Sequence, residues 1–375
     1  MIINKSVSLV GHPFAPIGMG EHVRCSFRSF RSVAMSPNIV DIYGLNKPDL
    51  DSKREFGSHI KESCTEMNIF HINGDEVEQS LAHLQNRMNE GSFNIIYPAW
   101  ELARYPKEWA AQLDRFDEIW APSEFIQKSL EPACEKPVLH MPLATEVILS
   151  SFLNRRYFGI PESDYTFLFF FDLQSYSTRK NPEAVILAFK TVLKNIASDK
   201  KNISLVMKVN GCEHNPSAFT QLKKTIAEFA DKIVLIENIM TDNEVKNLVR
   251  CCDCFISLHR SEGFGRGMAE AMFLGKPVIA TGYSGNMDFM SEDNAFIVPY
   301  ELVPVNDGDY PHWENQVWAE PNISVAVKYM LNLIHNPSLG YQVGAKASKN
   351  IRVEFGYRAV GLRYRNHIEM IMDKL

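Results

Sequence analysis

The chain has 375 residues, of which 45% are hydrophobic and 22% charged, the composition of an ordinary globular protein. This length exceeds one typical domain and is about right for two. The net charge of -6 argues against a general nucleic-acid binder, because such proteins are usually basic.

The amino-terminal segment MIINKSVSLVGHP predicts a strand followed by a turn, and it lacks the long apolar run of a signal peptide. The longest apolar run, at 167–171, is far shorter than the roughly 20 residues that cross a bilayer. Seven scattered cysteines predict reduced thiols, and the Cys-x-x-Cys spacing at 251–254 has no second pair at zinc-finger distance. We therefore expect a cytoplasmic protein without a metal site.

In the first half of the chain, short apolar runs alternate with amphipathic segments, as in a parallel sheet covered by helices on both faces. The expected strands are Val7–Gly11, Ile39–Tyr43, Ile69–Ile72, Asn94–Pro98, Glu118–Ala121 and Val138–Met141. Helical patterns lie between several of them, for example at Glu21–Ala34 and Asp75–Asn89. The segment 150–164, rich in Ser, Asn, Arg and Pro, is typical of a linker.

The same alternation begins again after this segment. Strands are expected at Thr166–Phe171, Ser204–Val209, Ile233–Ile236, Cys254–Leu258, Val278–Ala280 and Ala295–Val298. Helices are expected at about 182–197, 217–230, 242–251, 266–275 and 322–335, with a last one at Tyr357–Lys374. We therefore predict two doubly wound, Rossmann-like α/β domains, at 1–158 and 159–355, that face each other across a cleft. Ligands in such folds bind outside the carboxyl ends of the strands.

A glycine-rich turn follows the expected strand at 254–258 and leads into a helix. Its three glycines would let the backbone approach a ligand closely. The free N–H groups and the positive dipole end of the helix suit a phosphate. The candidate ligand-binding residues of this turn are Gly263, Phe264, Gly265, Arg266 and Gly267.

Glu270 lies one turn into this helix among apolar neighbours, eight residues after Glu262. A lone buried carboxylate is unfavourable unless it is paired or hydrogen-bonded, and vicinal ribose hydroxyls would supply such bonds. Two glutamates at this spacing also occur on ordinary protein surfaces. The strand, the glycine turn and the apolar helix around them favour a binding site.

This stretch resembles the E-x7-E signature of GT4-type retaining glycosyltransferases. The resemblance covers roughly 165–300 and is weaker over the first half of the chain. Its matching segments are Asn247-Leu248-Val249, Asp253, Glu262-Gly263-Phe264-Gly265, Glu270-Ala271, Gly275-Lys276-Pro277-Val278-Ile279-Ala280 and Ser284-Gly285-Asn286.

The resemblance implies a GT-B fold whose C-terminal domain binds a nucleotide sugar and transfers the sugar with retention of configuration. Glu262 would contact the sugar, Glu270 the ribose, and the C-terminal helix at 356–375 would pack back on the N-terminal domain. The nucleotide sugar is a substrate, so no cofactor is expected, and UDP and GDP stay open as its nucleotide. The acceptor would be a glycan or a lipid-linked glycan, as in the synthesis of bacterial surface polysaccharides.

Arg179 and Lys180 lie at a strand-to-helix turn, just before Asn181-Pro182, a good helix start. Two cations there suit a diphosphate, whose charge must be stabilised in the transition state; the alternative is an exposed basic turn. The family's usual arginine soon after the first strand of this domain is absent, and 172–175 reads Asp-Leu-Gln-Ser. Lys180 is therefore the better match, with Arg179 in place of the missing arginine. No Asp-x-Asp ends a strand, so metal-independent transfer is expected.

Further candidates lie at other turns. Gly18 and Gly20 are similar to the glycine loop that touches donor phosphate in the family, although a Gly-x-Gly is often only a turn. Relatives often carry a histidine for the donor sugar near the end of the strand at 94–98, where this chain has Trp-Glu. The candidates for contact with the donor sugar or the acceptor are His12, Trp100, Glu101 and Asn286.

Arg24, Arg28 and Arg31 share one face of the first expected helix. One interpretation is a solvated charged face. The other is a patch for anionic lipid or a phosphorylated acceptor, which would bring the protein to the cytoplasmic face of a membrane.

Other functions stay open. The same fold class includes nucleotide-sugar epimerases and glycan phosphorylases, and fold alone does not decide between them. A phosphorylase would carry a lysine for pyridoxal phosphate, which nothing marks here. A dehydrogenase would need Gly-x-Gly-x-x-Gly after the first strand, and Val23 breaks that pattern. A non-catalytic sugar-binding module would not need Glu262, Glu270 and Lys180 together.

Overall fold

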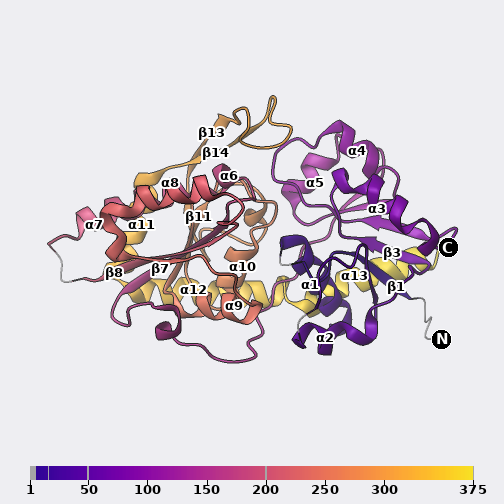
Figure 1. Ribbon diagram of the computed structural model, residues 1–375, viewed down its shortest axis with the longest axis horizontal. Coiled ribbons are helices and arrows are strands. Elements are labelled where there is room, and N and C mark those ends of the chain that lie inside the picture. Colours follow the sequence, from indigo (N-terminus) through magenta and orange to yellow (C-terminus); the bar gives the residue numbers. More distant parts are fainter. Residues whose placement is uncertain (1–5, 16, 49, 199–200, 375) are drawn as a thin grey trace. The chain divides into compact units, whose positions relative to one another are not determined.

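The computed structural model describes residues 6–15, 17–48, 50–198 and 201–374. The chain divides into two compact units, the first formed by Met1–Thr145 with Val353–Leu375 and the second by Glu146–Arg352. Each unit is built on a six-stranded parallel sheet covered by helices (Figure 1). The predicted class of two Rossmann-like α/β domains is confirmed.

The sheet of the first unit has the strand order β2-β1-β3-β4-β5-β6. Its strands are β1 (Val7–Gly11), β2 (Asn38–Asp41), β3 (Met67–Phe70), β4 (Phe93–Ile96), β5 (Glu118–Ala121) and β6 (Val138–His140). All residues of β1, β3 and β5 are buried. This is expected of parallel strands with helices on both faces, and it explains why short apolar runs were sufficient to predict them.

The helices of the first unit include one from the far end of the chain. They are α1 (Gly18–Ser32), α2 (Leu50–Phe56), α3 (Val77–Leu84), α4 (Lys107–Leu113), α5 (Glu124–Leu130) and α13 (Tyr357–Met372). The last of them runs along α1, where a Cβ on Gly361 would come within 2.1 Å of the Ser29 carbonyl oxygen. The Tyr364 hydroxyl donates a 3.2 Å hydrogen bond to the Pro142 carbonyl, and its ring stacks on Trp120. The carboxyl-terminal helix is thus part of the core of the first unit.

The three arginines of α1 do not form the cationic surface that their spacing suggests. The Arg24 Nε donates a 2.7 Å hydrogen bond to Glu21, and Arg28 donates two 2.8 Å bonds to the carboxylate of Glu55. Both side chains are largely buried, at 17% and 16% exposure. Arg31 alone of the three is exposed, with a 3.1 Å bond to the Ser36 hydroxyl. Arg24 and Arg28, two of the three arginines expected to contact anionic lipid or a phosphorylated acceptor, are therefore paired with Glu21 and Glu55 of the same unit.

We expect Arg28→Gln to lower the free energy of unfolding by about 1–3 kcal/mol, because it removes a largely buried cation that pairs with Glu55 and with the buried Glu21. Arg31→Gln is the matched control on the same helix and should change stability by less than about 0.5 kcal/mol. Urea unfolding followed by circular dichroism measures both. Equal losses from the two changes would contradict the assigned ion pairs.

The sheet of the second unit has the strand order β12-β11-β10-β7-β8-β9. Its strands are β7 (Tyr165–Asp172), β8 (Ile203–Asn210), β9 (Ile233–Ile236), β10 (Cys254–Ser257), β11 (Val278–Thr281) and β12 (Phe296–Val298). A separate antiparallel hairpin, β13 (Tyr300–Pro304) and β14 (Val317–Pro321), follows the last of these strands. The sequence predicted the parallel strands but not this hairpin.

Helices cover both faces of the second sheet (Figure 1). They are α6 (Ser177–Lys180), α7 (Pro182–Asn195), α8 (Pro216–Ile226), α9 (Asp242–Cys251), α10 (Arg266–Phe273), α11 (Ile323–His335) and α12 (Pro337–Glu354). The buried residues of α7, α8 and α11 form one apolar core with the strands. On the other side, α10 packs on β10 and β11 beside α9.

The second unit begins earlier than the sequence predicted, at Glu146 rather than residue 159. The segment taken for a linker is held on α9 through two asparagine side chains. Asn243 Oδ1 accepts from the Ser150 backbone at 2.9 Å, and Asn247 Oδ1 accepts from the Leu153 backbone at 3.0 Å. The polar composition of this segment suggested a linker. The bonds that hold it come from side chains far along the sequence, so the local composition did not reveal them.

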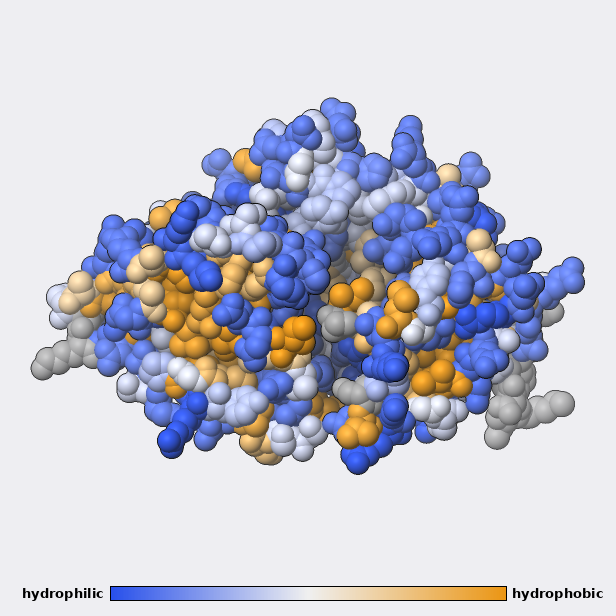
Figure 2. Space-filling model, viewed as in Figure 1, coloured by the Kyte–Doolittle hydropathy of each residue, from blue (hydrophilic) through white to orange (hydrophobic). Residues whose placement is uncertain are grey.

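Among the described residues, no helix has the length and apolar character needed to cross a bilayer. On the face shown in Figure 2, hydrophilic side chains predominate, and hydrophobic ones gather in patches within each unit. The seven cysteines are free thiols, and Cys251, Cys252 and Cys254 are buried. Burial raises the pKa of the Cys252 thiol, so these three sulfurs are unreactive core groups.

Candidate functional site

The chemistry-bearing residues of the second unit gather at the carboxyl ends of β7, β10 and β11. The turn after β7 carries α6, the turn after β10 leads into α10, and the turn after β11 runs through 282–288. Because parallel strands end at the same edge of a sheet, these three turns come together. They bring Arg179 and Lys180 to Glu262.

Glu262 lies between two cations. Lys180 Nζ bonds to its Oε1, and Arg179 Nη1 lies 3.4 Å from its Oε2. The residue is 7% exposed. Burial alone would raise its pKa, but the charges of Lys180 and Arg179 lower the pKa to about 2. The carboxylate is therefore ionised at every physiological pH.

The backbone of Glu262 is fixed by the turn after β11. Its N–H donates a 2.8 Å hydrogen bond to the Ser284 hydroxyl, and its carbonyl accepts a 2.9 Å bond from the Gly285 N–H. A Cβ on Gly285 would come within 1.9 Å of the Gly263 carbonyl oxygen, so only glycine fits there. Ser284 and Gly285 therefore position the backbone of Glu262, and the close approach of the two turns requires glycine at 285.

Arg179 is anchored from several sides and is 2% exposed. Its Nη1 donates a 2.9 Å bond to the Ser261 carbonyl, and its Nη2 donates a 3.2 Å bond to the Ser175 hydroxyl. The short helix that carries it is flanked by left-handed residues, Tyr176 and Asn181. As predicted, Asn181 caps a helix that begins at Pro182. The cation is thus held beside the turn after β10.

The glycines of that turn have packing reasons as well as room for a ligand. Gly265 caps α10 with a φ of +94°, a conformation that favours glycine. A Cβ on Gly267 would lie 2.5 Å from the ring of Phe170 in β7. The ring of Phe264 packs on Phe289 at 5.1 Å. Arg266 and Gly263 complete the turn, and its shape is therefore set by the unit's own core.

Glu270 lies one turn into α10 and is 7% exposed. Its immediate neighbours Ala269 and Ala271 are fully buried. The helix thus places two largely buried carboxylates, Glu262 before it and Glu270 within it, near the same edge of the sheet.

His259 is a buried member of this region that the sequence analysis missed. Its Nε2 lies 3.1 Å from Asn286 Oδ1 and 3.2 Å from the Tyr283 carbonyl, and its Nδ1 lies 3.0 Å from the Ser257 hydroxyl. Two acceptors at Nε2 assign the proton to that nitrogen. Burial lowers the pKa of His259, which keeps the ring neutral. A single histidine after a strand has no spacing signature that would have revealed it.

Asn286 holds this histidine rather than presenting its amide to solvent. The side chain is fully buried, and its Nδ2 donates a 2.9 Å bond to the Thr281 carbonyl. With Oδ1 bonded to His259, both ends of the amide are engaged. Contact with sugar hydroxyls, expected from its position in the sequence, would require the amide to exchange these partners.

The remaining candidates belong to the first unit. His12 follows β1 and its Nε2 lies 3.6 Å from the Glu76 carboxylate, whose proximity raises the pKa of the histidine. A Cβ on Gly20 would lie 2.2 Å from the Ala15 carbonyl, so Gly20 is required by the turn itself. A Cβ on Gly18 would meet nothing within 4 Å. Packing therefore explains the glycine at position 20 but not the one at position 18, at the start of α1.

Trp100 and Glu101 differ from each other in exposure. The Trp100 ring is 2% exposed and packs edge-on against Tyr105 and Trp109, at 5.3 and 5.5 Å. Its Nε1 donates a 3.1 Å bond to the Arg104 carbonyl. Trp100 therefore supports the turn after β4, and Glu101 is the half-buried residue there.

Acid is expected to remove a stabilising contribution of Glu262. Its folded-state pKa of about 2 lies below the ordinary value of 4.5. The ionised carboxylate therefore stabilises the fold above pH 4.5, and this contribution is lost as the pH falls from 4.5 toward 2. Thermal unfolding of wild type and Glu262→Gln over this range should show their Tm difference shrinking with acid. A pH-independent difference would contradict the assigned charge cluster.

Comparisons with known proteins add a family to this geometry. Residues 153–302 match the model of the family described as Glycosyl transferases group 1. The trehalose synthase of Pyrococcus horikoshii is 24% identical over 145 residues, which are 38% of this chain. The matched region spans 30% of that protein's length. Residues 153–302, which contain both glutamates, are thus similar to the group 1 glycosyltransferases.

Solved structures match almost the whole chain. Anabaena HepE, in complex with UDP and glucose, has a TM-score of 0.70 at 12% identity, covering 98% of this chain and 100% of that one. Sucrose-phosphate synthase of Thermosynechococcus elongatus has a TM-score of 0.67 at 12% identity, covering 99% and 100%. A Rickettsia africae glycosyltransferase has a TM-score of 0.67 at 16% identity, covering 98% and 99%. The fold is therefore GT-B.

Proposed function

We propose that this protein is a retaining, GT4-type glycosyltransferase that moves a sugar from a nucleoside diphosphate to a glycan or lipid-linked glycan. The observation that carries the proposal is the charge cluster at the carboxyl edge of the second sheet. Glu262, buried and ionised, lies beside two cations, Arg179 and Lys180. A carboxylate next to a departing diphosphate and its cations is what transfer through a cationic anomeric carbon requires.

The two glutamates take different parts of the donor in this proposal. The cations meet the diphosphate, together with the N–H groups at the start of α10. Glu262 lies before the helix and faces the sugar, and Glu270 within the helix accepts hydrogen bonds from the ribose. Close packing requires glycine at 265 and 267, so no side chain at these two positions covers the backbone that would contact the phosphates.

UDP is the nucleotide that the comparisons favour. HepE is described in complex with UDP-glucose, and the pneumococcal O-GlcNAc transferase GtfA in complex with UDP and GlcNAc. We extend this to the present chain as a proposal, with the first unit binding the acceptor. A role in bacterial surface polysaccharide synthesis at a cytoplasmic location is the setting we infer from the resemblance of the sequence to GT4 enzymes.

A thermal-shift screen tests the donor site without knowledge of the acceptor. UDP at 100 times its dissociation constant should stabilise the protein by about 2.7 kcal/mol. The same screen with GDP, ADP and NAD separates a UDP-sugar enzyme from GDP-sugar enzymes and from dehydrogenases. The proposal requires a nucleoside diphosphate to give the largest shift. A larger shift with NAD, or none with any diphosphate, would refute it.

Transfer is expected to continue when divalent cations are removed. Arg179 and Lys180 already supply two positive charges for the diphosphate, so the donor needs no bridging ion and no further cofactor. Turnover in excess EDTA should equal turnover in buffer. A loss in EDTA that magnesium or manganese restores would show that the two side chains are insufficient.

A further inference from the structure

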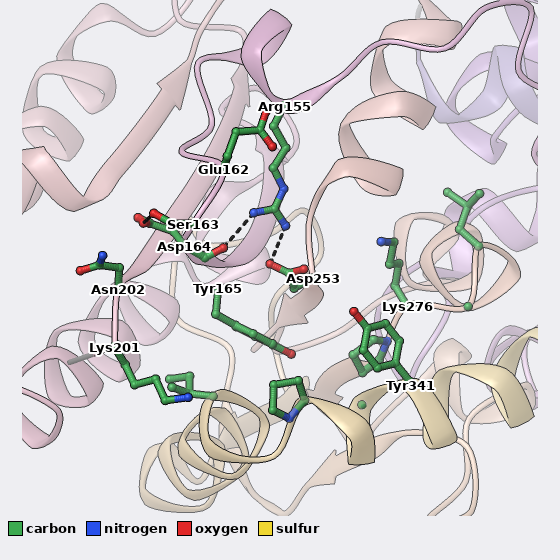
Figure 3. A pocket seen from close by; sticks show the side chains of 16 residues that line it. Arg155, Glu162, Ser163, Asp164, Tyr165, Lys201, Asn202, Asp253, Lys276 and Tyr341 are labelled. Carbon is green, nitrogen blue, oxygen red and sulfur yellow. Dashed lines mark hydrogen bonds and ion pairs between the residues drawn. The ribbon is translucent and has the colours of Figure 1, made fainter. Parts of the chain in front are cut away.

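A cavity of about 680 Å³ lies in the second unit at the amino ends of its strands (Figure 3). Asp164 and Asn202 precede β7 and β8, Asp253 precedes β10, and Pro277 precedes β11. The first turns of α12 close the opposite wall. The Glu262 cluster lies at the carboxyl ends of these strands, and the eight residues of β7 span about 25 Å between the two edges. The cavity is therefore distinct from the Glu262 cluster and lies at the opposite edge of the same sheet.

Hydrogen bonds around Arg155 and Asp253 tie together the back wall of this cavity. Arg155 donates a 2.7 Å bond to Asp253 Oδ2, a 2.8 Å bond to the Asp164 carbonyl and a 2.9 Å bond to the Cys251 carbonyl. Asp253 Oδ2 also accepts a 2.8 Å bond from the Thr166 N–H. Each guanidinium nitrogen donates at least one hydrogen bond and this carboxylate oxygen accepts two, so they shape the cavity before any ligand arrives.

Three other side chains of the lining have polar ends that are available to a ligand. Within the described part of the chain, the structure records no hydrogen bond or ion pair for the Lys276 amine or for the hydroxyls of Tyr165 and Tyr341. In Figure 3 these three groups point into the same space, next to the Asp253 carboxylate. Lys276 and Tyr165 are half-buried, and this burial lowers the pKa of Lys276 and raises the pKa of Tyr165. Such groups gain by meeting a polar ligand.

The charges of the lining are balanced. Its cations are Arg155, Lys201 and Lys276, and its anions are Glu162, Asp164 and Asp253. A polyphosphate or a polycation would meet as much repulsion as attraction. A neutral polyhydroxylated molecule can instead donate to the carboxylates, accept from the lysine and tyrosine groups, and lay its C–H face on a phenol ring.

We propose that this cavity is a second, non-catalytic binding site for a neutral saccharide. Tyr165, Tyr341, Lys276 and Asp253 surround the sugar, and Asn202 lies at its rim. The volume of about 680 Å³ exceeds what one phosphate ion needs and falls in the range of pockets that bind small organic ligands. The site lies away from the proposed donor site, so its occupation does not depend on sugar transfer.

The test is saturation-transfer NMR and calorimetry on the whole chain with glucose, galactose, N-acetylglucosamine, maltose, sucrose and trehalose. At least one sugar should bind, with a dissociation constant on the order of 1 mM. Tyr341→Ala, at a side chain 72% exposed, and Lys276→Met should each weaken binding about tenfold. Lys346→Met, an exposed lysine further along α12, is the control and should bind as wild type does.

A further variant separates this site from the donor site. Lys180→Met alters the charge cluster at the other edge of the sheet, so sugar binding should persist in it. Binding that is lost in Lys180→Met and unchanged in Tyr341→Ala and Lys276→Met would overturn the proposal. So would the absence of binding across the whole panel, or displacement of the bound sugar by an equal concentration of inorganic phosphate.

Discussion

Replacing Glu262 with glutamine should lower kcat by about 10²–10³-fold while changing the KM for the donor little. As the anomeric carbon becomes cationic, the carboxylate interacts with it more strongly than with the bound donor, so the loss falls on the transition state. Glutamine keeps the size of the side chain and removes its charge. Steady-state kinetics with the true donor measure the effect.

Glu270→Gln is the matched comparison for this prediction. In the proposed complex Glu270 holds the ribose equally in the ground and transition states, so weakening its hydrogen bonds should mainly raise the donor KM. Both variants should remain folded at neutral pH, where circular dichroism can confirm it. Small and equal effects of the two changes would mean that this loop and helix are not the donor site.

Replacing Lys180 with methionine should lower kcat/KM by about 10²–10³-fold. In the proposed complex the change removes a cation from the departing diphosphate, and it leaves Glu262 with Arg179 as its partner. The affinity for UDP should fall with it, because both donor and product carry the diphosphate. Lys180→Arg should recover part of the activity, since it restores the charge with a different geometry.

Lys190→Met is the control for that change. Lys190 lies on α7, ten residues further along, and is paired with Glu228 on the surface. Its loss should leave kcat/KM within about twofold of wild type, as expected for an exposed pair. Comparable losses at Lys180 and Lys190 would show that general charge, rather than the position of Lys180, matters.

The parallel strands could be predicted from the sequence because buried parallel strands are short apolar runs between helical patterns. The hairpin β13–β14 could not, because its strands are joined by the long segment 305–316 rather than by a two-residue turn, even though Asp307-Gly308 lies within that segment. Helix α12 was not predicted either. It begins with Pro337 and contains Gly340 and Gly344, which lower helix propensity. A Cβ on Gly344 would lie 2.1 Å from the Gly275 carbonyl, so close packing explains that glycine.

The candidate site was predictable where it follows a local pattern. The spacing of Glu262 and Glu270 and the pair Arg179-Lys180 were visible in the sequence, and the fold brings Glu262 to both cations. The supports of that cluster were not visible. Ser284 and His259 act through contacts between separate turns, which no spacing within one segment reveals.

The most direct test of sugar transfer with retention is a proton NMR time course with UDP- and GDP-linked sugars. Each sugar is linked through its α-anomeric oxygen and is supplied with a pool of glycan acceptors or with water alone. The account predicts that one donor is turned over and that the first product carries the α-configuration, before mutarotation mixes the anomers. This turnover should be lost in Glu262→Gln. A β-configured first product, or turnover that Glu262→Gln leaves unchanged, would contradict the account.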